Sequence, residues 1–125
     1  MRIRFGVAPA GALIARLAGC AGQPNFNPSD PAYKLLHAGR YSEARAPLAA
    51  ELARDPDNPY LQFDMASDYQ NLGHMELAAP LYRKVIANAK DIVPAVASDP
   101  TEAGMTLSDM ACTNLRRGLH DNFTC

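Results

Sequence analysis

Three histidines and three cysteines are the side chains of this 125-residue chain most capable of chemistry. The histidines are isolated from one another along the chain: His37, His74 and His120. No His-x-x-x-His or Cys-x-x-Cys spacing for a metal occurs, and no Gly-x-Ser-x-Gly elbow, phosphate loop or dinucleotide fingerprint. We expect Glu51, Asp55 and Asp57 in turns or on solvated faces. The sequence therefore predicts a protein that is not an enzyme and has no metal, no cofactor and no small-molecule substrate.

Cys20 closes an amino-terminal segment with the features of a bacterial export signal. Residues 1–4 carry two arginines, residues 5–14 are apolar and small, and residues 17–20 have the sequence Leu-Ala-Gly-Cys. The apolar stretch is shorter than the roughly 20 residues that a membrane-spanning helix needs. Leu-Ala-Gly-Cys resembles the lipobox of bacterial lipoproteins. The resemblance implies that a signal peptide, residues 1–19, is removed and that the Cys20 thiol is acylated.

Arg16 departs from this pattern because a charge interrupts the apolar run just before the lipobox. The alternative is ordinary secretion, with cleavage after Ala21 and a soluble periplasmic product. With acylation, lipid would anchor the chain in the bacterial cell envelope, facing the periplasm. By resemblance to enteric lipoprotein sorting, Ala21 favours the outer over the inner membrane. Residues 20–31 are rich in Pro, Asn and Gly, and we expect the lipidated cysteine to start a flexible tether there.

The charge balance argues against nucleic acid as a partner. The whole chain has a net charge of -1, and removal of residues 1–19 leaves nine basic and 13 acidic side chains. A mildly acidic body is not attracted to an anionic membrane surface, so the lipid alone would hold it there. Hydrophobic residues at 48% and charged residues at 20% are typical of one globular domain.

Cys112 and Cys125 remain as an even pair if Cys20 is acylated. In an oxidising compartment such a pair favours a disulfide. Closing a loop of about 14 residues stabilises a domain by roughly 3 kcal/mol in the chain-entropy model. Free or intermolecular thiols are the alternative.

The chain matches itself at an offset of 34 residues. Positions of similar type pair as follows: Ala32 with Ala66, Leu35 with Tyr69, Gly39 with Gly73, Tyr41 with Met75, Ala44 with Ala78, and Leu48 with Tyr82, whereas Glu51 with Val85 is a poor pair. This pattern predicts two helix–turn–helix units. Gly39 and Gly73 would end the first helices in the left-handed conformation. Ala44 and Ala78 would let the paired helices approach closely.

Prolines set the expected helix boundaries. The segment 55–59, Asp-Pro-Asp-Asn-Pro, closes the first unit. Prolines upstream shorten the first helix, which we expect to begin near Asp30. Pro47 and Pro80 are expected near the starts of second helices, where proline is best tolerated, with Pro47 far enough in to kink its helix.

These positions resemble the tetratricopeptide repeat family. The matching residues are Ala66, Tyr69, Gly73, Ala78, Tyr82 and the closing Asp55-Pro56. The resemblance covers about residues 30–90 and implies an all-α fold, a short right-handed solenoid of two helix–turn–helix units and a carboxy-terminal capping helix. That domain would span residues 32–118, with 119–125 as a tail. The alternative is a generic pair of helical hairpins with a chance period.

After residue 90 the register breaks. Residues 91–103 contain two prolines and are expected to form a loop or a short helical turn from Asp99-Pro100. Thr106 and Asp109 then form a predicted capping box. The capping helix has an apolar stripe before Gly118: Leu107, Met110, Ala111 and Leu115. At an offset of 45, Asp64-Met65-Ala66 matches Asp109-Met110-Ala111, and Gly73 matches Gly118. We therefore interpret the capping helix as the first helix of a third unit, which follows an insertion.

In tetratricopeptide domains the first helices line a concave groove that holds a segment of a partner protein. Carried onto this chain, the expected contacts are Tyr33, Leu36, His37, Tyr60, Phe63, Asp64, Ser67, Gln70, Asn71, Asp109 and Arg116. Tyr60 and Phe63 are the expected anchors because aromatic residues contribute strongly to interfaces, and packing between helices is their alternative role. Asp64 and Ser67 stand where a basic clamp for carboxy-terminal peptides would need Lys and Asn, which disfavours a chaperone-type clamp.

The expected function is that of a membrane-anchored envelope lipoprotein acting as a protein-interaction scaffold or assembly factor. Its partners would be proteins of the cell envelope, with the membrane reached through the lipid. This expectation rests on analogy of fold. The alternative is a structural, self-associating periplasmic repeat protein with no dedicated partner groove.

Overall fold

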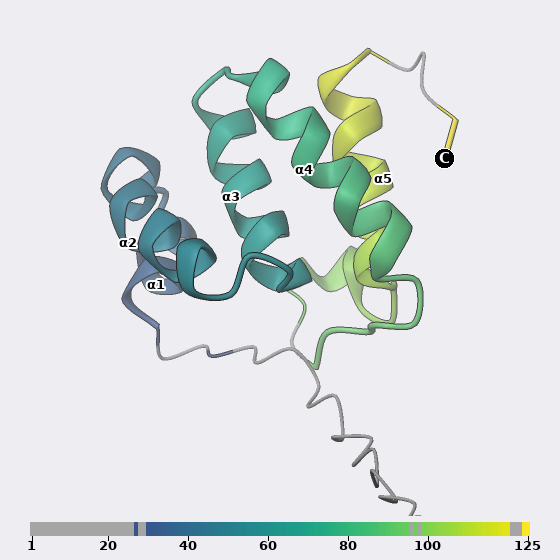
Figure 1. The fold of residues 1–125 in the computed structure, drawn as a ribbon. Coiled ribbons are helices and arrows are strands. Elements are labelled where there is room, and N and C mark those ends of the chain that lie inside the picture. The colour runs from purple at the N-terminus through teal and green to yellow at the C-terminus, as the bar shows by residue number, and fades with distance from the viewer. Residues whose placement is uncertain (1–26, 28–29, 96, 98, 121–123) are drawn as a thin grey trace, which may run out of the picture.

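The computed structural model describes residues 27, 30–95, 97, 99–120 and 124–125. These residues form five α-helices, one 3₁₀ turn and no strand, which confirms the predicted all-α class (Figure 1). The helices are α1 (Pro31–His37), α2 (Tyr41–Arg54), α3 (Pro59–Asn71), α4 (Met75–Asn88) and α5 (Leu107–Gly118), with the 3₁₀ turn η1 at Pro100–Glu102. The predicted signal peptide, Cys20 and most of the predicted tether lie outside the described residues. Within the described part of the chain, no helix is long and apolar enough to cross a membrane.

The helix boundaries follow the 34-residue offset. α4 begins and ends 34 residues after α2, and α3 ends 34 residues after α1. At each turn between paired helices a glycine has positive φ, 71° at Gly39 and 82° at Gly73. Glycine takes this left-handed conformation without the steric strain that a Cβ brings.

Side-chain caps fix where three helices start. Asp30 accepts a hydrogen bond from the Ala32 amide at 2.8 Å, so α1 begins where the prolines predict. Asn58 caps α3, and its amide oxygen accepts from the Tyr60 N–H at 3.0 Å. Thr106 caps α5 as predicted. Each cap satisfies a backbone donor that the first turn of a helix leaves unpaired.

Successive helices pack side by side, α1 on α2, α2 on α3, α3 on α4 and α4 on α5 (Figure 1). α3 also contacts both α1 and α5. The first helices of the two units and α5 therefore share one side of the molecule, with α2 and α4 behind them. η1 confirms the predicted helical turn in the segment that leads to α5.

Two apolar clusters form the core. Ala44 and Ala78 are completely buried, and one turn later Leu48 and Tyr82 are buried on the same helix faces. Because alanine adds only a methyl group, the paired helices can approach closely at these positions. The apolar stripe of α5 is buried against α4 and completes the larger cluster, as predicted.

The expected placement of two prolines near helix starts is wrong. Pro47 and Pro80 lie inside α2 and α4, at the seventh and sixth helical positions, because these helices begin directly after the glycine turns. Gly118, which the offset of 45 pairs with Gly73, does not share the positive φ of Gly73. It is the last residue of α5, and His120 beyond it has a φ of 54°. A Cβ on Gly118 would overlap the thioether of Met75, so the end of that flexible side chain would have to move to make room for it.

The carboxy-terminal end returns to α5. Cys112, which is buried in α5, and Cys125 are paired at disulfide distance, with their Cα atoms 6.0 Å apart. This pairing agrees with the prediction.

Candidate functional site

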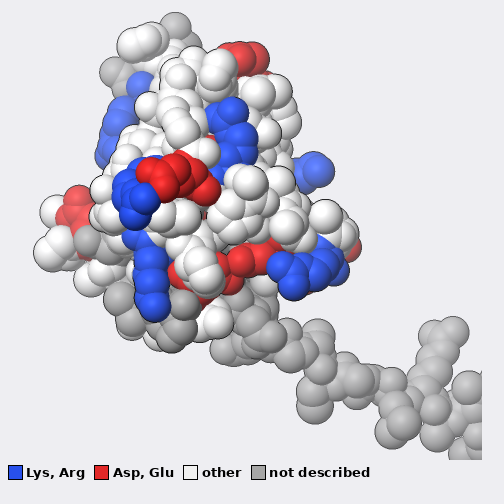
Figure 2. Space-filling model, turned by 90° about the vertical axis from the view of Figure 1, so that its left-hand side faces the viewer, with Lys and Arg blue, Asp and Glu red and all other residues white. Residues whose placement is uncertain are grey.

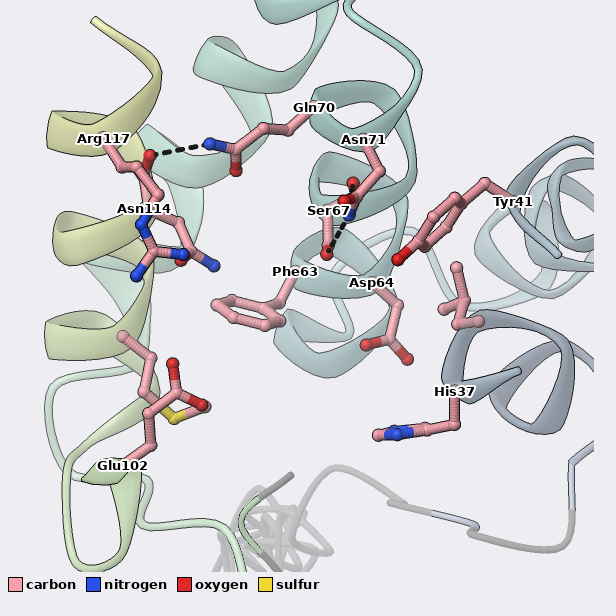
Figure 3. Close-up of a pocket in the computed structure, with 12 residues that line it drawn as sticks. His37, Tyr41, Phe63, Asp64, Ser67, Gln70, Asn71, Glu102, Asn114 and Arg117 are labelled. Atoms are coloured by element: carbon pink, nitrogen blue, oxygen red, sulfur yellow. Dashed lines mark hydrogen bonds between the residues drawn. The ribbon is translucent and has the colours of Figure 1, made fainter. Parts of the chain in front are cut away.

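The concave side of the molecule is hollowed into a groove of about 410 Å³. α1 and the start of α2 form one wall, α3 forms the floor, and α5 with η1 forms the other wall (Figure 3). The groove is lined by Leu36, His37, Tyr41, Phe63, Asp64, Ser67, Gln70, Asn71, Glu102, Met110, Asn114 and Arg117. A volume of this size is typical of ligand sites in proteins.

Phe63 is the central apolar residue of the floor. Its ring meets that of Tyr82 edge to face, with 5.7 Å between the ring centroids, so one side of Phe63 belongs to the core. In Figure 3 the ring lies between Asp64 and α5, open to the groove. Phe63 therefore both closes the core and offers an apolar contact surface.

Gln70 connects three helices at the back of the groove. The Tyr82 hydroxyl donates to Gln70 Oε1 at 2.7 Å, and Gln70 Nε2 donates to the backbone oxygen of Asn114 at 3.1 Å (Figure 3). Burial raises the pKa of Tyr82, which keeps its hydroxyl protonated as a donor. The amide of Gln70 thus positions α5 against α3 and α4. Its part in the groove is to set the distance between the walls.

Ser67 and Asn71 form the rim of α3 that faces α2. Asn71 Nδ2 donates to the Ser67 backbone oxygen at 2.8 Å, one turn back in the same helix (Figure 3). Asn71 is exposed and Ser67 half-buried. The Asn71 side-chain oxygen and the Ser67 hydroxyl give this rim polar atoms suited to hydrogen bonding with a peptide backbone.

A second, smaller cavity of about 30 Å³ lies where α1, α2 and α3 meet. Asp30, Glu51 and Asp64 line it, so we call it the carboxylate cavity. Burial, a hydrogen bond with Asp30 and the charge of Asp30 raise the pKa of Glu51 to about 7, against a weaker lowering by Arg54. Burial and the charges of Glu51 and Asp30 raise the pKa of Asp64 to about 7. Glu51 is thus not on a fully solvated face, because α1 and its capping residue cover that part of α2.

Asp64 borders both spaces, since it lines the groove as well as the carboxylate cavity. In Figure 3 its carboxyl group points toward the side on which His37 lies. The ring of His37 in turn contacts that of Tyr33, with 4.0 Å between the ring centroids.

A partly buried ion pair joins α2 to α3 away from the groove. Arg45 Nε lies 3.3 Å from Asp68 Oδ2, and Asp68 is completely buried. Burial raises the pKa of Asp68, an effect that Arg45 opposes. Arg45 also covers the ring of Tyr69, 5.0 Å from its centroid, which ties the pair to the core. This position makes the pair a structural link between the two units.

Charges of both signs are interspersed on the side of the molecule drawn in Figure 2. Arg40 and Glu43 at the start of α2 form an exposed ion pair. Neither sign dominates this face, unlike the basic surfaces that bind nucleic acid. Among the described residues, no group of three His, Cys, Asp or Glu side chains is placed to hold a metal ion.

The structure brings most of the expected contact residues together. Those that line the groove are Leu36, His37, Phe63, Asp64, Ser67, Gln70 and Asn71. Tyr33 and Tyr60 instead line the carboxylate cavity, with Tyr60 also packed against the larger core cluster. Arg116 and Asp109 are exposed on α5 and do not line the groove.

Five groove residues were not among the expected contacts: Tyr41, Glu102, Met110, Asn114 and Arg117. Met110, Asn114 and Arg117 are spaced four and three residues apart, which places them on one face of α5, at the edge of the apolar stripe that includes Met110. A helical projection of residues 107–118 would show that these three residues share one face. The offset of 45 missed it, because α5 turns a different face to the groove than α3 does. Tyr41 and Glu102 carry no such signal, because Tyr41 is the first residue of α2 and Glu102 is the last residue of the short η1.

Comparison with protein-family models, with curated proteins and with solved structures found no match to this chain.

Proposed function

We propose that this protein holds an extended segment of a partner protein in the groove between α1, α3 and α5. The observation that carries the proposal is the groove itself, which three non-consecutive helices build together. Its lining combines apolar side chains such as Phe63 and Met110 with amides and hydroxyls such as Asn71 and Ser67. Such a mixture suits a peptide, which offers side chains and backbone polar groups in turn.

We further propose that the domain is a short tetratricopeptide-like solenoid of two units and a cap. The equal spacing of the helices, the left-handed glycines at matched turns and the buried alanines of α2 and α4 support it. α5 supports the capping role, because it covers α4 and one end of the larger core cluster. The chain would then be a binding scaffold rather than an enzyme.

The location we propose is the bacterial cell envelope, with the chain anchored through acylated Cys20. Support comes from the lipobox-like sequence of residues 17–20 and from the paired Cys112 and Cys125, which suit an oxidising compartment. One acyl chain gives only marginal membrane binding, whereas two or more give stable anchoring. The outer membrane is favoured by Ala21.

Charge reversal on α5 tests the groove. Arg117 lines the groove, whereas Arg116, its neighbour on the same helix, is exposed outside it. Arg117→Glu should therefore weaken capture of envelope proteins by the purified lipoprotein, and Arg116→Glu should leave capture close to wild type. The two variants change the net charge equally, so a difference between them reports on the groove rather than on overall charge.

A further inference from the structure

Asp64 occupies a place in the groove where negative charge is concentrated. The carboxylate cavity puts Asp30 and Glu51 behind it. Across the groove, η1 contributes Glu102. In Figure 3 the carboxyl groups of Asp64 and Glu102 both lie in the lower half of the groove, while Arg117 lies above them on α5. Two neighbouring acidic groups, Glu51 and Asp30, raise the pKa of Asp64.

We infer that this end of the groove binds an arginine or lysine side chain of the partner segment, with the Asp64 carboxylate as its ion-pair partner. The inference rests on the proposed function and names the chemistry of the occupant. A cation placed there would supply a counter-charge to three crowded carboxyl groups at once. Because Asp64 is partly shielded from water, the attraction exceeds that of an exposed pair.

The surroundings of Asp64 suit a cation carried on a peptide better than a free metal ion. Among the described residues, no group of three acidic, His or Cys side chains is placed to hold a metal. Leu36, Phe63 and Met110 line the same groove and can receive apolar side chains next to the cationic one. The long stems of arginine and lysine also pack on apolar surface while the charged end reaches a polar group.

Binding of such a cation must be linked to protons. Below about pH 7 Asp64 is mostly protonated and neutral, and above it the carboxylate is charged. If only the charged form binds the cation, affinity should rise about tenfold from pH 6 to pH 8. The other charged or titratable groups around Asp64 are Asp30, His37, Glu51, Arg54, Glu102 and Arg117. Of these, Glu51 also has a pKa raised to about 7, but it lines the carboxylate cavity and not the groove.

The test is a nuclear magnetic resonance titration of the full chain in detergent micelles with two tripeptides. One is acetyl-Leu-Arg-Leu-amide, and the other carries neutral citrulline, which has nearly the same shape, in place of arginine. We expect the arginine peptide to shift the backbone amide signals of α3 around Asp64 and to bind at least about tenfold more tightly than the citrulline peptide at pH 8. Asp64→Asn should abolish this preference, and with it the pH dependence of arginine binding. Asp109→Asn, on the exposed side of α5, should keep both, as should His37→Gln.

Equal binding of the two peptides at the groove would overturn the inference while leaving a peptide-binding groove in place. The inference also fails if Asp64→Asn retains the preference for arginine, or if His37→Gln alone removes the pH dependence. If neither peptide shifts the α3 signals, the cation site is absent. The proposed function is judged separately, by the capture experiment with Arg117→Glu and Arg116→Glu.

Discussion

At the scale of single residues, the carboxylate cavity makes stability depend on pH. Glu51 and Asp64 have pKa values of about 7 in the folded chain, above their ordinary values of 4.5 and 3.8. The folded state therefore binds more protons than the unfolded state between about pH 4 and pH 7. Stability is greatest at the acidic end of this window and falls as the pH rises through 7. The raised pKa of Asp68 acts in the same direction.

We accordingly expect the melting temperature of the purified chain to be a few degrees higher at pH 5.5 than at pH 8, as followed by circular dichroism. Asp64→Asn should raise the melting temperature at pH 8 and flatten the pH dependence, because it removes one of the crowded charges. Asp57→Asn, in an exposed turn, is the matched control and should preserve the wild-type slope. A melting temperature that rises with pH would contradict this account of the cavity.

At the scale of helices, close packing depends on the alanines that the 34-residue offset aligns. Ala78 lies on α4 and is completely buried where α4 packs against neighbouring helices. Ala78→Leu should destabilise the domain by about 1–3 kcal/mol through overpacking. Ala50→Leu, on the exposed side of α2, should have little effect. Chemical denaturation measures both, and equal small effects would contradict the repeat assignment.

Much of the helical framework could be predicted from the sequence because its signals are local. The glycine turns at Gly39 and Gly73 and the caps at Asp30 and Thr106 each depend on a few neighbouring residues. The faces of α5 could not be assigned in this way. Its rotation is set by tertiary contacts such as the hydrogen bond from Gln70, which joins residues 44 positions apart.

The groove was predicted less completely for the same reason. On α3 the groove residues are those that the repeat pattern predicts, because that pattern also gives the order of the helices that pack against both sides of α3. On α5 the pattern placed Arg116 at the groove where the structure places Arg117, a rotation of one residue along the helix. The raised pKa of Glu51 likewise arises from α1 and its cap, which no local pattern in α2 reveals.

At the scale of the whole molecule, we propose that a helical binding domain is joined to a lipid anchor. Cys20→Ser should move the protein from the membrane to the soluble fraction and abolish incorporation of labelled palmitate, because the thiol that carries the acyl chain is gone. A chain with Cys112 and Cys125 both replaced by Ser is the control and should keep the label. Wild-type protein that takes up no label, with the Cys20→Ser variant still in the membrane, would contradict acylation.

Quantitative capture with Arg117→Glu and Arg116→Glu tests whether the groove between α1, α3 and α5 holds a protein segment. Solubilised envelopes are passed over equal amounts of each purified lipoprotein, and bound proteins are quantified by mass spectrometry. Circular dichroism first shows that both variants are folded. We expect at least one protein to be captured equally by wild type and Arg116→Glu. Its capture by Arg117→Glu should be reduced about tenfold or more, because a charge that meets the partner is reversed only in that variant. Equal capture by all three proteins would contradict a partner site in this groove.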